Sequence, residues 1–178
     1  MVSINKAMII MAHPDDVEIS CYGILNKLSK QGTKCYIVIA SNGENGLRTL
    51  NNVSNVILRK NETQKALLNI VEKIIWLELN DGCISFDLKL INYIEDLLKT
   101  YSPQLVITHY PDGFGIEHQD HSALGKATIN VALRCCNQLN FLLLAEPLIY
   151  NITDFKPNWG LRTKSWTPKF DASRRFCP

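Results

Sequence analysis

The fold of this chain follows from Ala7-Met8-Ile9-Ile10-Met11-Ala12-His13-Pro14-Asp15-Asp16. A short, continuous apolar run that ends abruptly in polar residues is typical of a strand buried within a sheet. In an open parallel sheet, ligands bind at the carboxyl ends of the strands, where side chains converge on one crevice. The run therefore predicts a buried strand, and the imidazole and two carboxylates that follow it indicate a site for chemistry.

A second polar cluster of the same kind lies far downstream. Leu105-Val106-Ile107-Thr108 has the pattern of another buried strand, and the loop after it leads to His118-Gln119-Asp120-His121. Three of the four histidines of the chain lie in these two clusters, and the fourth, His109, directly follows the second strand. We expect both clusters at the same edge of the sheet. His109 is either part of that site or a hydrogen-bonded polar residue at a strand end.

Apolar runs alternate with stretches of helical periodicity along the chain. Further strands are expected at 35–40, 73–77, 141–144 and 148–150, a polar loop at 41–54, and helices through Ile19, Leu25 and Leu28 and at about 56–70, 87–101 and 120–133. Strands that alternate with helices of this length predict right-handed crossovers. The expected fold class is therefore α/β, with a single Rossmann-like domain whose mostly parallel sheet is covered by helices on both faces.

The character of the sequence changes from residue 156 onward, where prolines, a glycine and several basic residues replace the alternating pattern. We therefore expect one domain at 1–155, followed by an irregular, basic C-terminal tail at 156–178. Neither an internal repeat nor a low-complexity linker marks any other boundary.

Composition and charge exclude several classes of protein. A length of 178 residues matches one domain, and 46% hydrophobic with 20% charged residues is usual for a globular core. The net charge of +2 is too small to favour nucleic acid or an anionic membrane as a partner. The longest apolar run near the start is far shorter than the roughly 20 residues of a spanning helix. Since no secretion signal precedes that run, we expect a cytoplasmic chain without a transmembrane segment.

The six cysteines show no Cys-x-x-Cys spacing and lie mostly in apolar surroundings. This pattern favours reduced, buried thiols over disulfides. Cys21, close to the first cluster, is either a packing residue of the first helix, which we favour, or a reactive or metal-binding thiol.

The two clusters together offer the ligands of a catalytic zinc site. Such a site uses three protein ligands and keeps one position open for water, and His13, Asp16 and His121 can supply this set. Asp15 is then free to take a proton from the bound water, whose pKa zinc lowers from 15.7 to roughly 7. Iron(II) suits the same ligands, so the expected cofactor is Zn²⁺, with Fe²⁺ as the alternative.

The other polar residues of the clusters have expected roles as well. His118 lies one helical turn from His121 and is expected to face the substrate oxygen as a cation. Asp120 is expected to orient a neighbouring imidazole and keep it protonated. An alternative interpretation is that Asp15 or Asp16 is an ordinary helix N-cap.

The two motifs resemble those of the LmbE-like, or PIG-L, family of zinc-dependent N-deacetylases. These proteins carry Ala-His-Pro-Asp-Asp near the start and His-x-Asp-His late in a Rossmann-like domain, which correspond to residues 12–16 and 118–121 of this chain. Weaker similarities lie between them, in Ser41-Asn42-Gly43-Glu44, Arg59-x-x-Glu62 and Asn80-Asp81-Gly82. The resemblance covers residues 6–133.

The resemblance implies hydrolysis of the acetamide of a small amino sugar, commonly an N-acetylglucosaminyl group, to a free amine and acetate. It implies that His13, Asp16 and His121 hold the metal. Amide hydrolysis must stabilise a tetrahedral oxyanion and protonate a poor leaving group, so further residues are needed beside the metal.

The resemblance also implies roles for those further residues. Asp15 matches the general base that later protonates the departing amine. His118 matches the cation that helps to stabilise the oxyanion, and Asp120 matches its orienting partner. Arg59 and Asp81 are implied, through looser matches, as substrate-binding residues.

The chain departs from the family pattern in two places. Gln119 stands where the family commonly has proline, and residues 159–178 show little of the expected strand and helix pattern. Two alternatives therefore stay open: a metal-dependent hydrolase of another amide, and a degenerate, non-catalytic sugar- or nucleotide-binding module. The second would favour a G-x-G-x-x-G turn after the first strand, which the chain lacks. The oligomeric state is open too, a homo-oligomer included.

Overall fold

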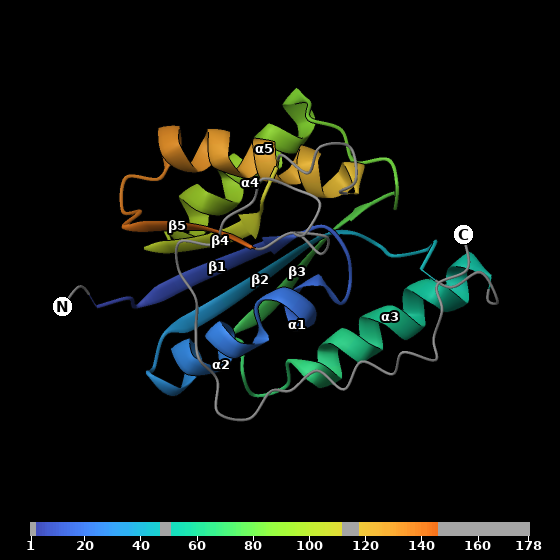
Figure 1. The fold of residues 1–178 in the computed structure, drawn as a ribbon, viewed down its shortest axis with the longest axis horizontal. Helices are drawn as coiled ribbons and strands as arrows, with labels where there is room; N and C mark the ends of the chain where they lie inside the picture. The colour runs from blue at the N-terminus through green and yellow to red at the C-terminus, as the bar shows by residue number, and fades with distance from the viewer. Residues whose placement is uncertain (1–2, 47–50, 112–117, 146–178) are drawn as a thin grey trace, which may run out of the picture.

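The computed structural model describes residues 3–46, 51–111 and 118–145, which form a parallel sheet between helical layers (Figure 1). The elements in chain order are β1 (Lys6–Met11), α1 (Asp16–Ser20), α2 (Tyr22–Lys30), β2 (Lys34–Ser41), α3 (Asn52–Ala66), β3 (Lys73–Leu79), α4 (Leu88–Tyr101), β4 (Leu105–His109), α5 (Gln119–Cys135) and β5 (Phe141–Ala145). The strand expected at 148–150 and the tail expected at 156–178 lie outside the described residues.

The sheet has the strand order β3-β2-β1-β4-β5, and every pair in it is parallel. Ile9 of the central strand β1 is level with Ile37 of β2 on one side and with Ile107 of β4 on the other. After β1, the chain adds β2 and β3 on one side of it, and then adds β4 and β5 on the other side. The point between β1 and β4 is therefore the topological switch point, where open α/β sheets bind ligands.

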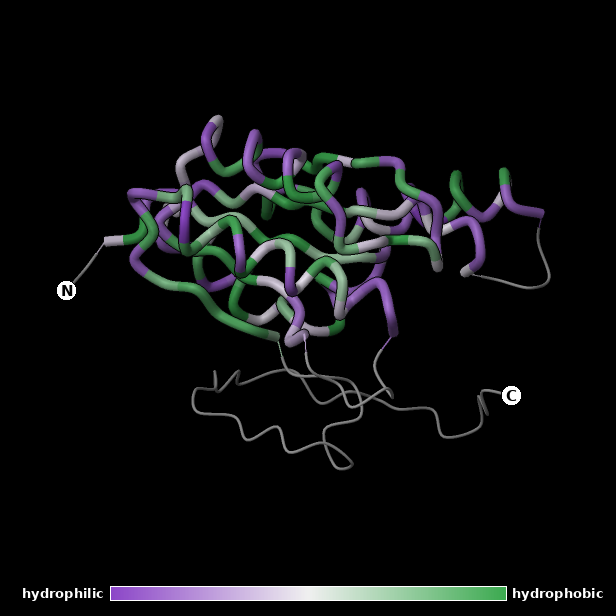
Figure 2. Tube along the Cα trace, turned by 90° about the horizontal axis from the view of Figure 1, so that it is seen from above, coloured by the Kyte–Doolittle hydropathy of each residue, from purple (hydrophilic) through white to green (hydrophobic). Residues whose placement is uncertain are grey.

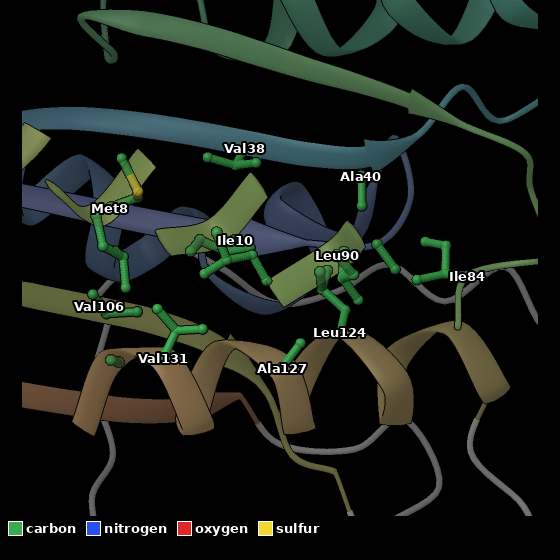
Figure 3. Close-up of a cluster of buried hydrophobic side chains, with 14 residues drawn as sticks. Met8, Ile10, Val38, Ala40, Ile84, Leu90, Val106, Leu124, Ala127 and Val131 are labelled. Carbon is green, nitrogen blue, oxygen red and sulfur yellow. The ribbon is translucent and has the colours of Figure 1, made fainter. Parts of the chain in front are cut away.

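Both faces of the sheet are covered, as the sequence predicts, because β1 is apolar on both of its faces. Met8 and Ile10 pack with Val106 of β4, Leu124 of α5 and their neighbours in one cluster, whose side chains Figure 3 shows between the sheet and α5. The alternate residues of β1 pack on the opposite side with a second cluster that includes Leu25 of α2. Helices α4 and α5 lie on one side of the sheet and α1, α2 and α3 on the other (Figure 1).

The helix expected after β1 is broken into two. Cys21 separates α1 from α2, with φ −125° and ψ −6° outside the helical region. Because this break shifts the phase of the buried face, Ile19 is exposed, whereas Leu25 and Leu28 are buried as predicted. Cys21 itself is buried among the apolar residues of the second cluster, which confirms its packing role.

Local hydrogen bonds decide the helix boundaries that periodicity misses. Helix α3 begins at residue 52 rather than 56, because the side chain of Asn51 accepts a hydrogen bond from the Ser54 N–H and caps it. It ends at Ala66 rather than at residue 70, and Asn69 adopts a left-handed φ of 63°. Asp87 caps α4 in the same way through the Leu90 N–H.

The prediction of buried thiols is right for only part of the set. The described cysteines are all free: Cys21 and Cys35 are buried, Cys135 and Cys136 are half-buried, and Cys83 is exposed. Cys177 lies outside the described residues.

Figure 2 shows both purple and green within single turns of the helices, as expected for amphipathic helices with one hydrophilic and one hydrophobic face. Over the described part of the chain, no helix has both the length and the apolar character needed to cross a membrane.

Candidate metal centre

The two sequence clusters meet at the switch point of the sheet. His13 follows β1, Asp16 opens α1, and His121 lies in the first turn of α5. His13 Nδ1 lies 3.0 Å from His121 Nε2. Asp16 Oδ2 lies 3.4 Å from His13 Nδ1 and 3.3 Å from His121 Nε2. These three side chains are almost fully enclosed. Their donor atoms are close enough together to share one metal ion.

Asp16 is held in this position by its surroundings. Its Oδ2 accepts a hydrogen bond of 2.7 Å from the backbone N–H of His13. Burial alone would raise the pKa of Asp16, but the neighbouring His109, His121 and His13 hold it well below the usual range. Asp16 is therefore an anion in the folded protein, as a metal ligand must be.

His109 also lies at this site. The sequence leaves two interpretations of His109 open, a part of the site or a hydrogen-bonded residue at a strand end. His109 is the last residue of β4, is buried, and stacks on His121 with ring centroids 3.9 Å apart. Its Nε2 lies 2.9 Å from the backbone nitrogen of Ala12 and 3.3 Å from Asp16 Oδ2. The position at a strand tip was the available sequence signal, but the partner in β1 becomes visible only in the folded chain.

Asp120 orients His13. Its Oδ2 lies 3.1 Å from His13 Nε2, and Asp81 Oδ1 lies 3.2 Å from the same nitrogen. The Asp120 carboxylate also accepts the backbone N–H of Gly82 at 2.8 Å and of Ile84 at 3.0 Å. When a carboxylate binds one ring nitrogen of an imidazole, it fixes the tautomer and leaves the other ring nitrogen, here His13 Nδ1, to bind a metal.

The charges around His13 favour a cation at this point. Burial lowers the pKa of His13, but hydrogen bonds to Asp120, Asp16 and Asp81 outweigh it and raise the pKa to about 11. A buried ring among three carboxylates therefore attracts positive charge, which a proton or a metal ion can supply.

His118 lies closer to the backbone of Asp120 than to its carboxylate. Its Nδ1 accepts the backbone N–H of Asp120 at 3.2 Å, whereas the Asp120 carboxylate is 3.9 Å away. Burial and the neighbouring His13 lower the pKa of His118. The Asp120 carboxylate is committed to His13, and the cationic role of His118 stays a prediction. The His118 side chain is 46% exposed.

Asp15 lies beside the metal-ligand group and is paired with Arg59. Arg59 Nη2 lies 2.9 Å from Asp15 Oδ2, and the same nitrogen donates to the carbonyl oxygen of Pro14. Burial raises the pKa of Asp15 to about 6, although Arg59 opposes this shift.

Asp15 stands at the N-cap position of α1, but its side chain makes no capping hydrogen bond. The interpretation of Asp15 as an ordinary cap is therefore wrong.

The donor set suits a divalent transition metal. Two imidazole nitrogens and one carboxylate oxygen are ligands that both zinc and iron(II) accept. A second group that could hold an ion comprises His13, Asp81, His118 and Asp120. Since Asp120 is already committed to two backbone N–H groups and to His13, the His13, Asp16 and His121 group is the better candidate.

The fold and this donor set together define a Rossmann-like α/β domain with a candidate metal centre at its switch point. The family model of PIG-L, described as GlcNAc-PI de-N-acetylase, matches residues 8–132. The chain therefore belongs to the PIG-L family.

Two relatives support this assignment. The "Probable N-acetyl-alpha-D-glucosaminyl L-malate deacetylase 2" of Bacillus subtilis is 29% identical over 138 residues, which cover 73% of this chain and 62% of the relative. The "Uncharacterized deacetylase YaiS" of Escherichia coli is 30% identical over 142 residues, which cover 73% of this chain and 69% of the relative.

A solved structure shares the fold. The N,N'-diacetylchitobiose deacetylase from Pyrococcus horikoshii has a TM-score of 0.75 and 23% identity, over 80% of this chain and 61% of its own. This chain thus spans about three fifths of the length of that protein and of the Bacillus relative.

Proposed function

We propose that this chain is a metal-dependent hydrolase that removes the acetyl group from an N-acetylated amino sugar, giving a free amine and acetate. The observation that carries the proposal is the convergence of His13, Asp16 and His121 from two distant segments on one point at the switch crevice. The Bacillus relative is named a probable N-acetyl-alpha-D-glucosaminyl L-malate deacetylase and the Pyrococcus protein an N,N'-diacetylchitobiose deacetylase, and both names support this substrate class.

His13, Asp16 and His121 would hold the ion, with Zn²⁺ as the expected metal and Fe²⁺ as the alternative. When bound, such an ion supplies Lewis-acid polarisation of a carbonyl and a water of lowered pKa. Asp120 and Asp81 keep His13 Nε2 engaged, so that Nδ1 is the nitrogen that would bind the ion in place of a proton.

Asp15 and His118 would move the protons and stabilise the charge. Asp15, whose side chain is 49% exposed, is open to the crevice and takes a proton from the attacking water, then delivers it to the departing amine. His118 directs a donor nitrogen toward the oxyanion, because its other nitrogen is occupied by the Asp120 N–H. Asp81, which lies 3.2 Å from His13 Nε2, would bind substrate from this position.

The test compares wild type with Asp16→Ala after metal loading. We expect wild type to bind one zinc per chain and to release acetate and amine from N-acetylglucosaminyl conjugates, and Asp16→Ala to lose both. Asp96→Asn, which changes an exposed carboxylate on α4, is the matched control and should behave as wild type. Stoichiometric zinc in Asp16→Ala, or no acetate from metal-loaded wild type, would overturn the proposal.

A panel of N-acyl substrates separates the two remaining alternatives. If the chain releases amine from a non-sugar amide but not from the sugar conjugates, it is a hydrolase of another amide. Binding of the sugar without release would identify a non-catalytic module, an outcome that matters because the chain spans only 62% of the Bacillus relative. The oligomeric state and a cytoplasmic location stay predictions.

A further inference from the structure

We propose that Arg59 is a positioning residue that holds Asp15 in its working conformation, rather than a residue that grips the sugar. This inference rests on the proposed function, in which Asp15 carries the proton. One guanidinium nitrogen of Arg59 contacts both parts of the Pro14-Asp15 dipeptide: it lies 2.9 Å from Asp15 Oδ2 and donates to the Pro14 carbonyl oxygen. A single nitrogen on α3 therefore fixes a backbone group and a side chain that are adjacent in the chain.

Asp15 needs such support because its backbone is strained. Its φ of 103° with ψ of −24° lies in the left-handed region, which costs a residue other than glycine about 1–3 kcal/mol. On either side, the Asp16 N–H donates to the His13 carbonyl oxygen at 3.3 Å, and the Asp16 carboxylate accepts the His13 N–H. These bonds close the turn around Asp15 but leave its carboxylate unattached.

Arg59 is the side chain that holds this carboxylate. Within residues 3–46, 51–111 and 118–145, the Asp15 carboxylate has no other ion-pair or hydrogen-bond partner. Asp16 and Glu18 repel it electrostatically, and His13 attracts it. Loss of Arg59 would therefore release the Asp15 carboxylate from its ion-pair partner, which favours another rotamer and another backbone conformation.

The loop after β2 packs Arg59 into place from behind. A Cβ atom added to Gly46 would lie 3.0 Å from Arg59 Nη1 and 3.3 Å from its Cζ. A Cβ atom added to Gly43 would lie 2.9 Å from Pro14 Cγ and 3.7 Å from Arg59 Cβ. These two glycines thus let the loop close over Arg59 and Pro14, where larger residues would collide with them.

Exposure separates the two members of the pair. The Arg59 side chain is only 16% exposed, whereas the Asp15 side chain is 49% exposed. The carboxylate is therefore accessible to solvent, and the guanidinium is enclosed behind it, with Nη2 against Asp15 and Pro14 and Nη1 beside Gly46. Nη2 is committed to these two acceptors, which favours a positioning role.

A double-mutant cycle tests the coupling. The enzymes are zinc-loaded wild type, Arg59→Ala, Asp15→Asn and the double variant, with Lys65→Ala, an exposed cation on the same helix, as the matched control. We expect Arg59→Ala to lower kcat about 10- to 100-fold, since small misplacements of a reacting group have effects of this size. KM and zinc stoichiometry should stay within about twofold, and Arg59→Ala should add almost nothing to Asp15→Asn.

The outcomes separate this inference from the proposed function. A raised KM with unchanged kcat, or losses that multiply in the double variant, would overturn the positioning role while leaving the deacetylase intact. Arg59→Lys keeps the charge on the same helix and should recover part of kcat, which also guards against a misfolded alanine variant. If wild type releases no acetate, crystal structures decide: Asp15 should leave its left-handed conformation in Arg59→Ala, and an unchanged Asp15 would refute the inference.

Discussion

Replacing Asp120 by Asn changes hydrogen bonding at the metal centre without changing side-chain size. Asp120 is fully buried; its Oδ1 accepts the Ile84 N–H at 3.0 Å, and its Oδ2 accepts the Gly82 N–H at 2.8 Å and lies 3.1 Å from His13 Nε2. A carboxylate accepts hydrogen bonds at both oxygens, whereas an amide has one accepting oxygen and one donating NH₂ group. In either orientation, Asp120→Asn therefore sets a donor against a buried backbone N–H.

The expected cost follows from that one lost acceptor. An unsatisfied buried N–H costs about 1–3 kcal/mol, so the free energy of unfolding of the metal-free protein should fall by that amount. If the amide NH₂ faces His13 Nε2, it must donate to it, and the ring proton moves to Nδ1. That is the nitrogen directed at Asp16 and His121. A protonated Nδ1 cannot bind a metal, so we expect zinc affinity to fall about 10- to 100-fold.

Two measurements check this prediction. Urea unfolding in the presence of a chelator gives the stability of the metal-free protein, and competition with a chromophoric chelator gives the zinc affinity. Asp96→Asn makes the same chemical change at an exposed site on α4 and should shift stability by less than about 0.5 kcal/mol. If Asp120→Asn also stays within that limit and binds zinc like wild type, Asp120 does not orient His13 and the reasoning is refuted.

Two further substitutions test other parts of the site. His118→Ala should keep stoichiometric zinc but lose about 100- to 1,000-fold in turnover, the usual effect of removing one oxyanion donor; unchanged turnover would remove His118 from the mechanism. Gly125→Ala on α5 would place a Cβ atom 2.6 Å from the His109 carbonyl oxygen. Because overpacking costs about 1–3 kcal/mol and outweighs the roughly 1 kcal/mol of helix propensity gained, urea unfolding should show a net loss of stability. Zinc affinity should weaken as well, since His121 lies one turn away on the same helix, and a more stable variant would contradict this packing argument.

The buried strands were the most predictable part of the fold. The apolar runs at 7–11, 35–40 and 105–107, which form most of β1, β2 and β4, contain no charged residue, so the position of these strands follows from the runs themselves. The helix limits at Asn51 and Cys21 were less predictable. They depend on a side-chain cap and on a break in backbone conformation, neither of which leaves a periodic signal.

At the site, the available groups can be read from the sequence: two short clusters rich in His and Asp, each placed after a buried strand. Parallel strands with crossover helices bring such strand ends to one edge, and the convergence of His13, Asp16 and His121 follows from that rule.

The partner that each group takes depends on the folded chain. The Asp120 carboxylate contacts His13, across 107 positions in the chain, more closely than it contacts His118, and Arg59 binds the Pro14-Asp15 turn across 45. Hydrogen bonds and ion pairs act over about 3 Å, so they depend on how separate loops pack against one another. That packing is a property of the folded chain, and no spacing along the sequence encodes it.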